Sequence, residues 1–227
     1  MIKAAIFDFD GLLVDTEILS LKIYQNILAE YQIPFSRQEY SQNYSGCTEV
    51  QNIRRLLQTY ALPLSSEECL DRVLFEEKTL IGQGVKLKEG AKELLSWLKK
   101  HDVKIALATS STRERALSIL ERHGILDYFD AFVFSEDVTH GKPNPEVFLA
   151  ACTKLAVKPE DALVFEDSEN GIQAALNAGI PVVCVPDMKM PSNLHLSKCE
   201  AVLSTLNEAI EILESPALKK LDALDCK

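Results

Sequence analysis

The sequence predicts an α/β fold, a doubly wound parallel sheet with an all-helical block inserted after its first strand. Two observations predict the sheet. Short apolar runs recur without the alternation typical of half-exposed strands, as expected for strands covered on both faces. Between residues 103 and 185 these runs alternate with segments of helical periodicity, which favours right-handed crossovers between parallel strands. A third observation predicts the insertion, because residues 15–84 show helical periodicity only.

The individual elements follow from these patterns. Strands are expected at residues 4–7, 103–108, 131–134, 162–165 and 181–185. Core helices are expected at residues 90–101, 112–123, 145–157 and 168–178. Gly124 and Gly179 directly follow two of these helices, in the position typical of a helix C-cap. The tail is expected to add one amphipathic helix before a frayed charged end. We therefore expect a Rossmann-like core.

The helical block is expected to form a separate domain. Its helices are expected at residues 17–31, 48–60 and 65–81. Gly82-Gln83-Gly84 indicates a flexible exit from the block. We therefore expect a core domain of residues 1–14 and 85–227, and a small helical domain of residues 15–84 that is hinged at both ends.

The composition excludes several classes of protein. The chain has 227 residues, is 47% hydrophobic, and contains 24 Lys+Arg against 34 Asp+Glu, which gives a formal net charge of −10. This hydrophobic content suits a packed core, whereas disordered chains combine low hydrophobicity with high charge. An acidic chain without a cluster of Lys and Arg is not suited to nucleic acid or to an anionic membrane surface, so neither partner is expected.

The six cysteines indicate neither a zinc site nor a disulfide framework, because no two of them have CxxC spacing. The chain begins MIKAAIFDFD, without the basic region and cleavage site of a secretory leader. A cytoplasmic location with reduced thiols is therefore expected. Nothing in the sequence indicates a large second interface, so we expect a monomer.

Two aspartates follow the first expected strand. In Ile6-Phe7-Asp8-Phe9-Asp10-Gly11, the two-residue period of a strand directs both carboxylates to the same side. The carboxyl ends of parallel strands are where doubly wound sheets bind their ligands. Two acids this close raise each other's pKa unless a cation lies between them. The pattern indicates a metal site with a nucleophile and an acid, although a solvated acidic turn would give the same pattern.

Two further acids, Glu166 and Asp167, end another expected strand of the sheet. Three or four carboxylates converging on one edge require a cation, and oxygen ligands alone favour Mg²⁺. The helix that follows contains Gly171, Ala174 and Ala175, small residues that we interpret as tight packing on the sheet.

A hydroxyl group and a lysine follow the remaining strands. Thr109-Ser110-Ser111 comes after the second expected strand and opens a helix, where a hydroxyl and free amides favour an anion. Plain helix capping would explain the same residues. Lys142 stands between glycine and proline in a tight loop that can hold its ammonium group rigidly, although most lone lysines are solvated surface charges.

In chain order, four strand ends thus supply DxD, a hydroxyl, a lysine and ED. This set, together with DFDGLLVDTE and VFEDSENGIQAALNAG, resembles the haloacid dehalogenase (HAD) superfamily of phosphotransferases over essentially the whole chain. It is most similar to the branch with a helical cap between the first two motifs. That branch includes β-phosphoglucomutases and small sugar-phosphate phosphatases.

The resemblance implies a role for each residue. Asp8 would be the nucleophile, Asp10 the general acid and base, and Lys142 the group that steadies the phosphate and Asp8. Thr109, with the following Ser110 and Ser111, would bind the phosphate. The metal would be Mg²⁺, held by Asp8, the Asp10 carbonyl, Asp167 and Glu166. Residues 15–84 would be a mobile cap, contributing the loop at Gly46 to substrate binding.

The resemblance leaves phosphatase and mutase open. β-Phosphoglucomutases have a His early in the first cap helix and an Arg shortly after a cap glycine. At these positions this chain has Ser20 and Glu49, and a carboxylate repels the phosphate that it should hold. Arg54 or Arg55 on the next helix, or Arg113 beside the Thr109 loop, could substitute. We therefore expect a Mg²⁺-dependent phosphatase acting on a small phosphorylated metabolite, with a phosphohexomutase as the alternative.

Two other functions are less well supported. A haloacid dehalogenase needs neither Asp10 nor a metal, so the second acid argues against that reaction. A non-catalytic binding module would have lost at least one of four charged residues, and all four are present: Asp8, Asp10, Lys142 and Asp167.

Overall fold

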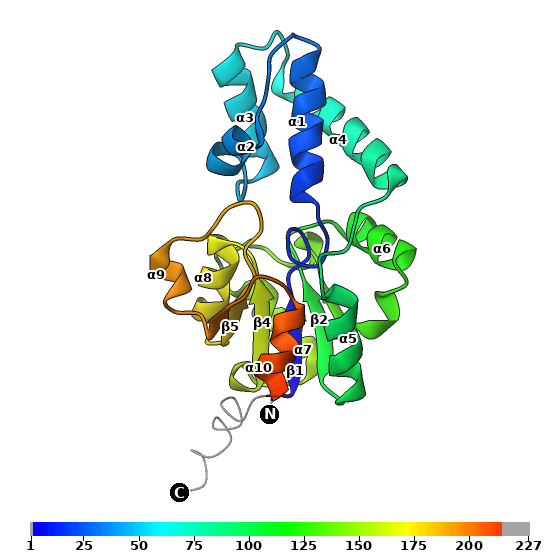
Figure 1. Ribbon diagram of the computed structural model, residues 1–227, viewed down its shortest axis with the longest axis vertical. Helices are drawn as coiled ribbons and strands as arrows, with labels where there is room; N and C mark the ends of the chain where they lie inside the picture. The colour runs from blue at the N-terminus through cyan, green and yellow to red at the C-terminus, as the bar shows by residue number, and fades with distance from the viewer. Residues whose placement is uncertain (1, 215–227) are drawn as a thin grey trace, which may run out of the picture. The chain divides into compact units, whose positions relative to one another are not determined.

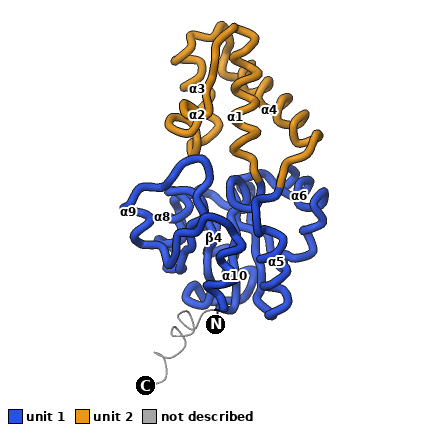
Figure 2. The backbone as a smooth tube through the Cα atoms, viewed as in Figure 1, with its two compact units in different colours: residues 1–14, 87–227 blue, residues 15–86 orange. Residues whose placement is uncertain are grey.

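The computed structural model describes residues 2–214 and confirms the predicted fold class (Figure 1). The chain forms two compact units (Figure 2). Unit 2 contains Asp15–Lys86, compared with the 15–84 expected for the inserted domain, and unit 1 contains the described residues on either side of it. The frayed end expected for the tail falls on residues 215–227, which lie outside the described residues.

Unit 1 is built on a parallel sheet that has six strands in the described part of the chain. These are β1 (Ala4–Phe7), β2 (Lys104–Ala108), β3 (Ala131–Val133), β4 (Ala162–Glu166), β5 (Val182–Cys184) and β6 (Ala201–Val202). Their order is β3-β2-β1-β4-β5-β6, so the first strand lies at the centre. Phe7 is level with Leu107 of β2 and with Phe165 of β4. The residues that follow these three strands therefore leave the sheet side by side.

Helices cover both faces of the sheet, which explains its unbroken apolar strands. The helices α7 (Glu146–Leu155) and α8 (Glu169–Asn177) share one apolar core with alternate strand residues such as Ile6 and Val164. The opposite face is covered by α5 (Ala91–Lys100), which packs against β2, and by α10 (Asn207–Glu214), as Figure 1 shows. Unit 1 also contains α6 (Arg113–Arg122) and the short α9 (Asn193–Leu196).

Several local predictions were wrong. The helix α6 begins at Arg113 with Thr112 as its N-cap, so Thr109 to Ser111 form a turn before the helix and do not open it. The helix α4 continues through Gln83 and ends at Gly84, so the expected flexible exit is mostly helix. The strand β6 and the helix α9 were missed, because elements of two to four residues leave almost no periodicity to detect.

Unit 2 consists, in the described residues, of α1 (Glu17–Ala29), α2 (Arg37–Asn43), α3 (Glu49–Tyr60) and α4 (Ser66–Gln83). Its core contains three fully buried tyrosines, Tyr24, Tyr40 and Tyr44. The Tyr24 hydroxyl donates a hydrogen bond to Glu49 at 2.8 Å, and the Tyr40 hydroxyl donates one to Glu17 at 3.1 Å. Buried hydroxyls require such acceptors, so unit 2 holds two of its acidic side chains in fixed positions.

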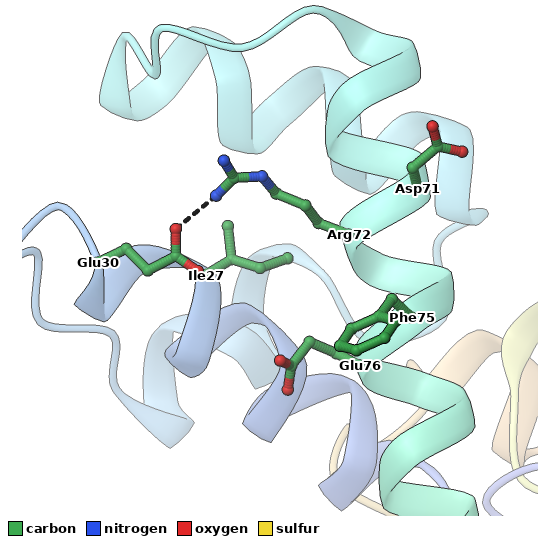
Figure 3. Close-up of a pocket in the computed structure, with 6 residues that line it drawn as sticks. All are labelled: Ile27, Glu30, Asp71, Arg72, Phe75 and Glu76. Atoms are coloured by element: carbon green, nitrogen blue, oxygen red, sulfur yellow. Dashed lines mark hydrogen bonds and ion pairs between the residues drawn. The ribbon is translucent and has the colours of Figure 1, made fainter.

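A hollow of about 380 Å³ lies on unit 2 between α1 and α4 (Figure 3). Arg72 spans it and pairs with Glu30, and the ring of Phe75 forms part of the wall. The pair neutralises part of the acidic lining, and no predicted site residue lies there. Among the described helices of both units, none combines the length and the apolar character needed to cross a membrane.

Candidate active site

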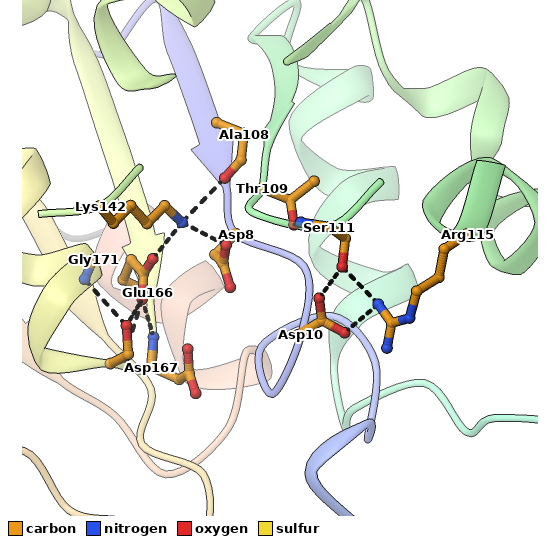
Figure 4. Close-up of polar contacts among 11 residues, drawn as sticks. Asp8, Asp10, Ala108, Thr109, Ser111, Arg115, Lys142, Glu166, Asp167 and Gly171 are labelled. Carbon is orange, nitrogen blue, oxygen red and sulfur yellow. Dashed lines mark hydrogen bonds and ion pairs between the residues drawn. The ribbon is translucent and has the colours of Figure 1, made fainter. Parts of the chain in front are cut away.

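The carboxyl ends of three neighbouring strands bring the predicted catalytic residues together. Asp8 follows β1, Thr109 follows β2, and Glu166 is the last residue of β4. Lys142 reaches the same edge from the loop before α7 (Figure 4). This edge is the usual ligand-binding position of a doubly wound sheet.

The Lys142 ammonium group joins two buried carboxylates. Its Nζ donates hydrogen bonds to Asp8 Oδ1 at 2.5 Å, to Glu166 Oε1 at 2.7 Å and to the carbonyl oxygen of Ala108 at 3.2 Å. The side chains of Lys142, Asp8 and Glu166 are 7%, 11% and 0% exposed. A lysine has three donors, and all three are directed at fixed acceptors here. The ammonium group is therefore held as rigidly as the tight loop predicted.

Both oxygens of Glu166 accept hydrogen bonds. Besides the bond from Lys142 to Oε1, Oε2 accepts from the Asp167 amide at 2.9 Å and from the Ser168 amide and hydroxyl, both at 3.0 Å. Gly171, in the first turn of α8, provides the space, because a Cβ at this position would lie 1.8 Å from the Glu166 carboxylate. Glu166 is thus a fixed group that orients Lys142 and the turn into α8.

Burial and the neighbouring charges shift the pKa values of Asp8 and Lys142. Desolvation raises the pKa of the Asp8 carboxyl from 3.8 to about 7, with further increases from Glu166 and Asp10, against the opposing effect of Lys142. Burial alone would lower the pKa of Lys142, but the attraction of Asp8 and Glu166 outweighs burial and raises it. Lys142 therefore stays charged, while an additional cation would be needed to hold Asp8 fully ionised at neutral pH.

The same edge offers a place for that cation. Asp8, Glu166 and Asp167 each present a carboxylate oxygen, and these oxygens lie within 4.8 Å of one another. A set of oxygen donors only is typical of Mg²⁺ rather than of zinc or copper. Glu166 already accepts four hydrogen bonds, so Asp8 and Asp167 have the better-placed oxygens for a direct contact. The carboxylate of Asp10 lies outside this group.

The Asp10 carboxylate is held on the other side of the site. It accepts hydrogen bonds from the Ser111 hydroxyl and from Nη1 of Arg115, the latter at 2.7 Å (Figure 4). Arg115 also donates to the Ser111 hydroxyl at 2.6 Å. Thr109 is 1% exposed, and its hydroxyl oxygen accepts a hydrogen bond from the Ser111 amide at 2.9 Å. The predicted acid and the predicted nucleophile thus have separate sets of partners.

The other residues predicted for substrate binding are Ser110, Arg113 and Gly46. Ser110 is exposed in the turn after Thr109. Arg113 stacks 4.5 Å over the ring of Phe134 and pairs with Asp137 at 3.1 Å, so its guanidinium group already has an anionic partner. Gly46 lies in unit 2, in a left-handed turn (φ +75°) before α3.

Sequence reasoning missed Arg115 and the role of Gly171. Arg113 was selected because it is nearest to the Thr109 loop, but Arg115, four residues after Ser111, lies one helical turn further on and reaches Asp10. The signal for Gly171 was its place in the first turn after Glu166, where a glycine is unfavourable for a helix unless its missing side chain is needed.

Comparisons with known proteins show a family model and several relatives that match this chain. The model of a protein family described as haloacid dehalogenase-like hydrolase matches residues 5–185. A phosphorylated carbohydrates phosphatase of Thermotoga maritima is 36% identical over 178 residues, which cover 78% of this chain and 82% of that protein. A β-phosphoglucomutase of Bacillus subtilis is 33% identical over 190 residues, which cover 81% and 83% of the two chains.

A solved structure shows the same fold. It is that of a conserved haloacid dehalogenase-like protein of unknown function from Agrobacterium tumefaciens. It superposes with a TM-score of 0.83 and 27% identity, covering 96% of this chain and 100% of the other. The similarity therefore includes both the sheet and the inserted helices.

We predict that Gly171→Ala destabilises the protein, because its Cβ would overlap the Glu166 carboxylate. The expected loss is about 1–3 kcal/mol, the usual cost of overpacking. Gly82→Ala is a matched control, since Gly82 is also helical and an added Cβ meets nothing within 4 Å. Chemical denaturation of both variants measures the difference, and equal stability of the two would contradict the fixed position of Glu166.

We also predict that Asp8→Asn stabilises the metal-free protein at high pH. Because folding raises the pKa of Asp8 from 3.8 to about 7, its contribution to stability is fully present below about pH 3.8 and is lost as the pH rises through 7. Asparagine cannot ionise and does not incur this loss. At pH 8, in a chelator, the variant should be more stable by roughly 2–4 kcal/mol, since one pKa unit is about 1.4 kcal/mol.

The advantage of Asp8→Asn should shrink between pH 7 and pH 4 in parallel unfolding experiments. Added Mg²⁺ should stabilise the wild type but not the variant. A variant that is less stable than the wild type at pH 8 would show that folding does not raise the pKa of Asp8.

Proposed function

Because this chain belongs to the haloacid dehalogenase-like hydrolase family, as the sequence resemblance predicted, we propose that it is a Mg²⁺-dependent phosphatase. Its substrate is a small phosphorylated sugar or polyol, and the reaction passes through an aspartyl phosphate. The observation that most supports this function is the buried contact between Lys142 and Asp8 at 2.5 Å, beside Glu166 and Asp167. This contact supports the proposal because the reaction needs a nucleophilic carboxylate, a positive charge and a cation close together.

The donor set fits Mg²⁺. Asp8 and Asp167 would supply carboxylate oxygens, and by the resemblance the main-chain carbonyl of Asp10 would complete the protein ligands. Glu166, which the resemblance includes among the ligands, belongs to the same group of carboxylates. Its four hydrogen bonds suit it better to holding Lys142 than to a direct contact with the metal. When bound, Mg²⁺ supplies positive charge that offsets the repulsion between the phosphate dianion and Asp8.

In the first step, Asp8 attacks the phosphorus atom of the substrate. Lys142 fixes Oδ1, and the other carboxylate oxygen points away from the ammonium group (Figure 4). A bond forms between that oxygen and phosphorus, and the bond from phosphorus to the alcohol oxygen breaks. The Lys142 charge and the Thr109 hydroxyl stabilise the transferring phosphoryl group. Asp10, protonated at this stage, gives its proton to the departing alcohol.

In the second step, water replaces the alcohol. Asp10, now ionised, takes a proton from the water, whose oxygen attacks phosphorus while the bond to Asp8 breaks. Phosphate leaves and Asp8 is restored. The contacts of Asp10 with Ser111 and Arg115 hold its carboxylate ready on the side away from Lys142. Arg115 thus orients the acid and base rather than the nucleophile.

A phosphohexomutase is the second candidate, supported by the similarity to the Bacillus subtilis β-phosphoglucomutase. A mutase binds a second phosphate, for which the resemblance expects an Arg at position 49. The residue there is Glu49, in the first turn of α3, and the buried Tyr24 hydroxyl holds its carboxylate at 2.8 Å. A fixed negative charge at this position disfavours a second phosphate, which supports hydrolysis as the main reaction.

The first test follows two products at once. The protein is incubated with Mg²⁺, β-glucose 1-phosphate and a trace of the 1,6-bisphosphate, while free phosphate and glucose 6-phosphate are measured. We expect phosphate to be released in a reaction that a chelator abolishes, with little formation of glucose 6-phosphate. If this sugar is a poor substrate, a panel of polyol phosphates is tested in the same way. Rapid formation of glucose 6-phosphate without free phosphate would identify a mutase.

The second test separates the two aspartates. Asp8→Asn should abolish turnover, because it removes the nucleophile. Asp10→Ala should slow turnover roughly 10²–10⁴-fold, the usual contribution of general acid–base catalysis. More than a few per cent of wild-type activity in Asp8→Asn would exclude Asp8 as the nucleophile, and a normal rate in Asp10→Ala would assign the proton transfer to another group.

A further inference from the structure

We propose that Asp187 is a positioning residue for the Mg²⁺ site, acting from just outside the direct ligands. The proposal rests on the proposed function, since it concerns the same cation. Asp187 belongs to none of the motifs on which the resemblance depends. Its side chain is 9% exposed, a degree of burial that an aspartate rarely has unless it is paired or belongs to a site.

The sheet brings Asp187 to the catalytic edge. It follows β5, which lies next to β4. Glu166 is level with Cys184, and the Val185 amide donates to the Glu166 carbonyl oxygen at 2.8 Å, so the chains run side by side where they leave the sheet. Asp187 therefore emerges beside the turn that contains Asp167.

The glycine of the first motif shows that Asp167 and Asp187 face the same small volume. Gly11 has φ +77°, and a Cβ at this position would lie 2.5 Å from Asp167 Oδ2 and 3.2 Å from Asp187 Oδ2. One carboxylate oxygen of each residue thus points toward the Cα of Gly11, which follows Asp10 directly. Only glycine, without a side chain, leaves this volume open.

Lys88 fixes the other oxygen of Asp187. Its Nζ donates to Oδ1 at 2.6 Å, and the Lys88 side chain is itself only 24% exposed. The Lys88 amide is anchored as well, because it donates to the Leu13 carbonyl oxygen at 2.9 Å. Asp187 is therefore held with Oδ1 toward Lys88 and Oδ2 toward the metal site.

This arrangement suits an outer contact to Mg²⁺. Mg²⁺ keeps several water molecules in protein sites, and carboxylates beyond the direct ligands orient such waters and increase the affinity. Asp187 Oδ2 and Asp167 Oδ2 both lie close to the position that a Cβ on Gly11 would take, at 3.2 and 2.5 Å, and Asp167 belongs to the group of carboxylates that could hold the cation. We assign to Asp187 the role of holding a water molecule that the cation would keep.

Calorimetric titration with MgCl₂ tests the assignment without any substrate. Asp187→Asn is nearly isosteric, and it should weaken Mg²⁺ binding roughly 10–100-fold, the usual effect of removing an outer-shell partner. Asp161→Asn is the matched control, because Asp161 also pairs with a lysine, Lys3 at 2.9 Å, but precedes β4 at the opposite end of the strand. It should leave the affinity unchanged. Unfolding temperatures without Mg²⁺ check that the variants fold, and Asp187→Ser serves as a second variant.

The outcomes are distinct. Equal Mg²⁺ affinities in the wild type, Asp187→Asn and Asp187→Ser would overturn the proposal, and so would an equal loss in Asp161→Asn, which would indicate a general charge effect. A wild type that binds no Mg²⁺ would overturn both this proposal and the metal dependence of the proposed function. Specific weakening in Asp187→Asn, with no phosphate release by the wild type, would support the proposal and contradict the phosphatase function.

Discussion

The contact of one buried ammonium group with two buried carboxylates is the interaction on which the site depends. Lys142 is almost inaccessible, and so are Asp8 and Glu166. Removing Lys142 would cost about 3–5 kcal/mol, because it would leave two buried carboxylates without a compensating charge. Two acids and one base still leave a net negative charge at the edge of the sheet. A divalent cation can offset that negative charge and the charge of an incoming phosphate group.

The fold provides this arrangement through the central position of β1. Parallel neighbours on both sides bring the ends of β2 and β4 beside Asp8. Gly171 then allows α8 to start against the Glu166 carboxylate, and Gly11 allows the first loop to pass close to Asp167. A sequence pattern would assign these two glycines to turns and packing. In the structure, each is needed because a side chain there would overlap a carboxylate of the site.

The sequence predicted the features that leave a pattern along the chain, and it missed those that depend on contacts between distant residues. Strands buried on both faces are continuous apolar runs, so five of the strands of the described sheet could be located, and parallel topology brought Asp8, Lys142 and Asp167 to one edge. Short elements such as β6 have no period to detect. Arg115 and Asp187 were missed for another reason, since their roles depend on side-chain directions and on contacts across 105 and 99 residues of sequence.

The most direct measurement is to trap the phosphoryl group on the protein. The enzyme is mixed with Mg²⁺ and a radiolabelled phosphate ester, quenched in acid within the first turnover, and digested for peptide mapping. The label is expected on the peptide that contains Asp8, and it should be released by hydroxylamine, as is typical of an acyl phosphate. Turnover of the ester without label on Asp8, or with label on another residue, would contradict the mechanism.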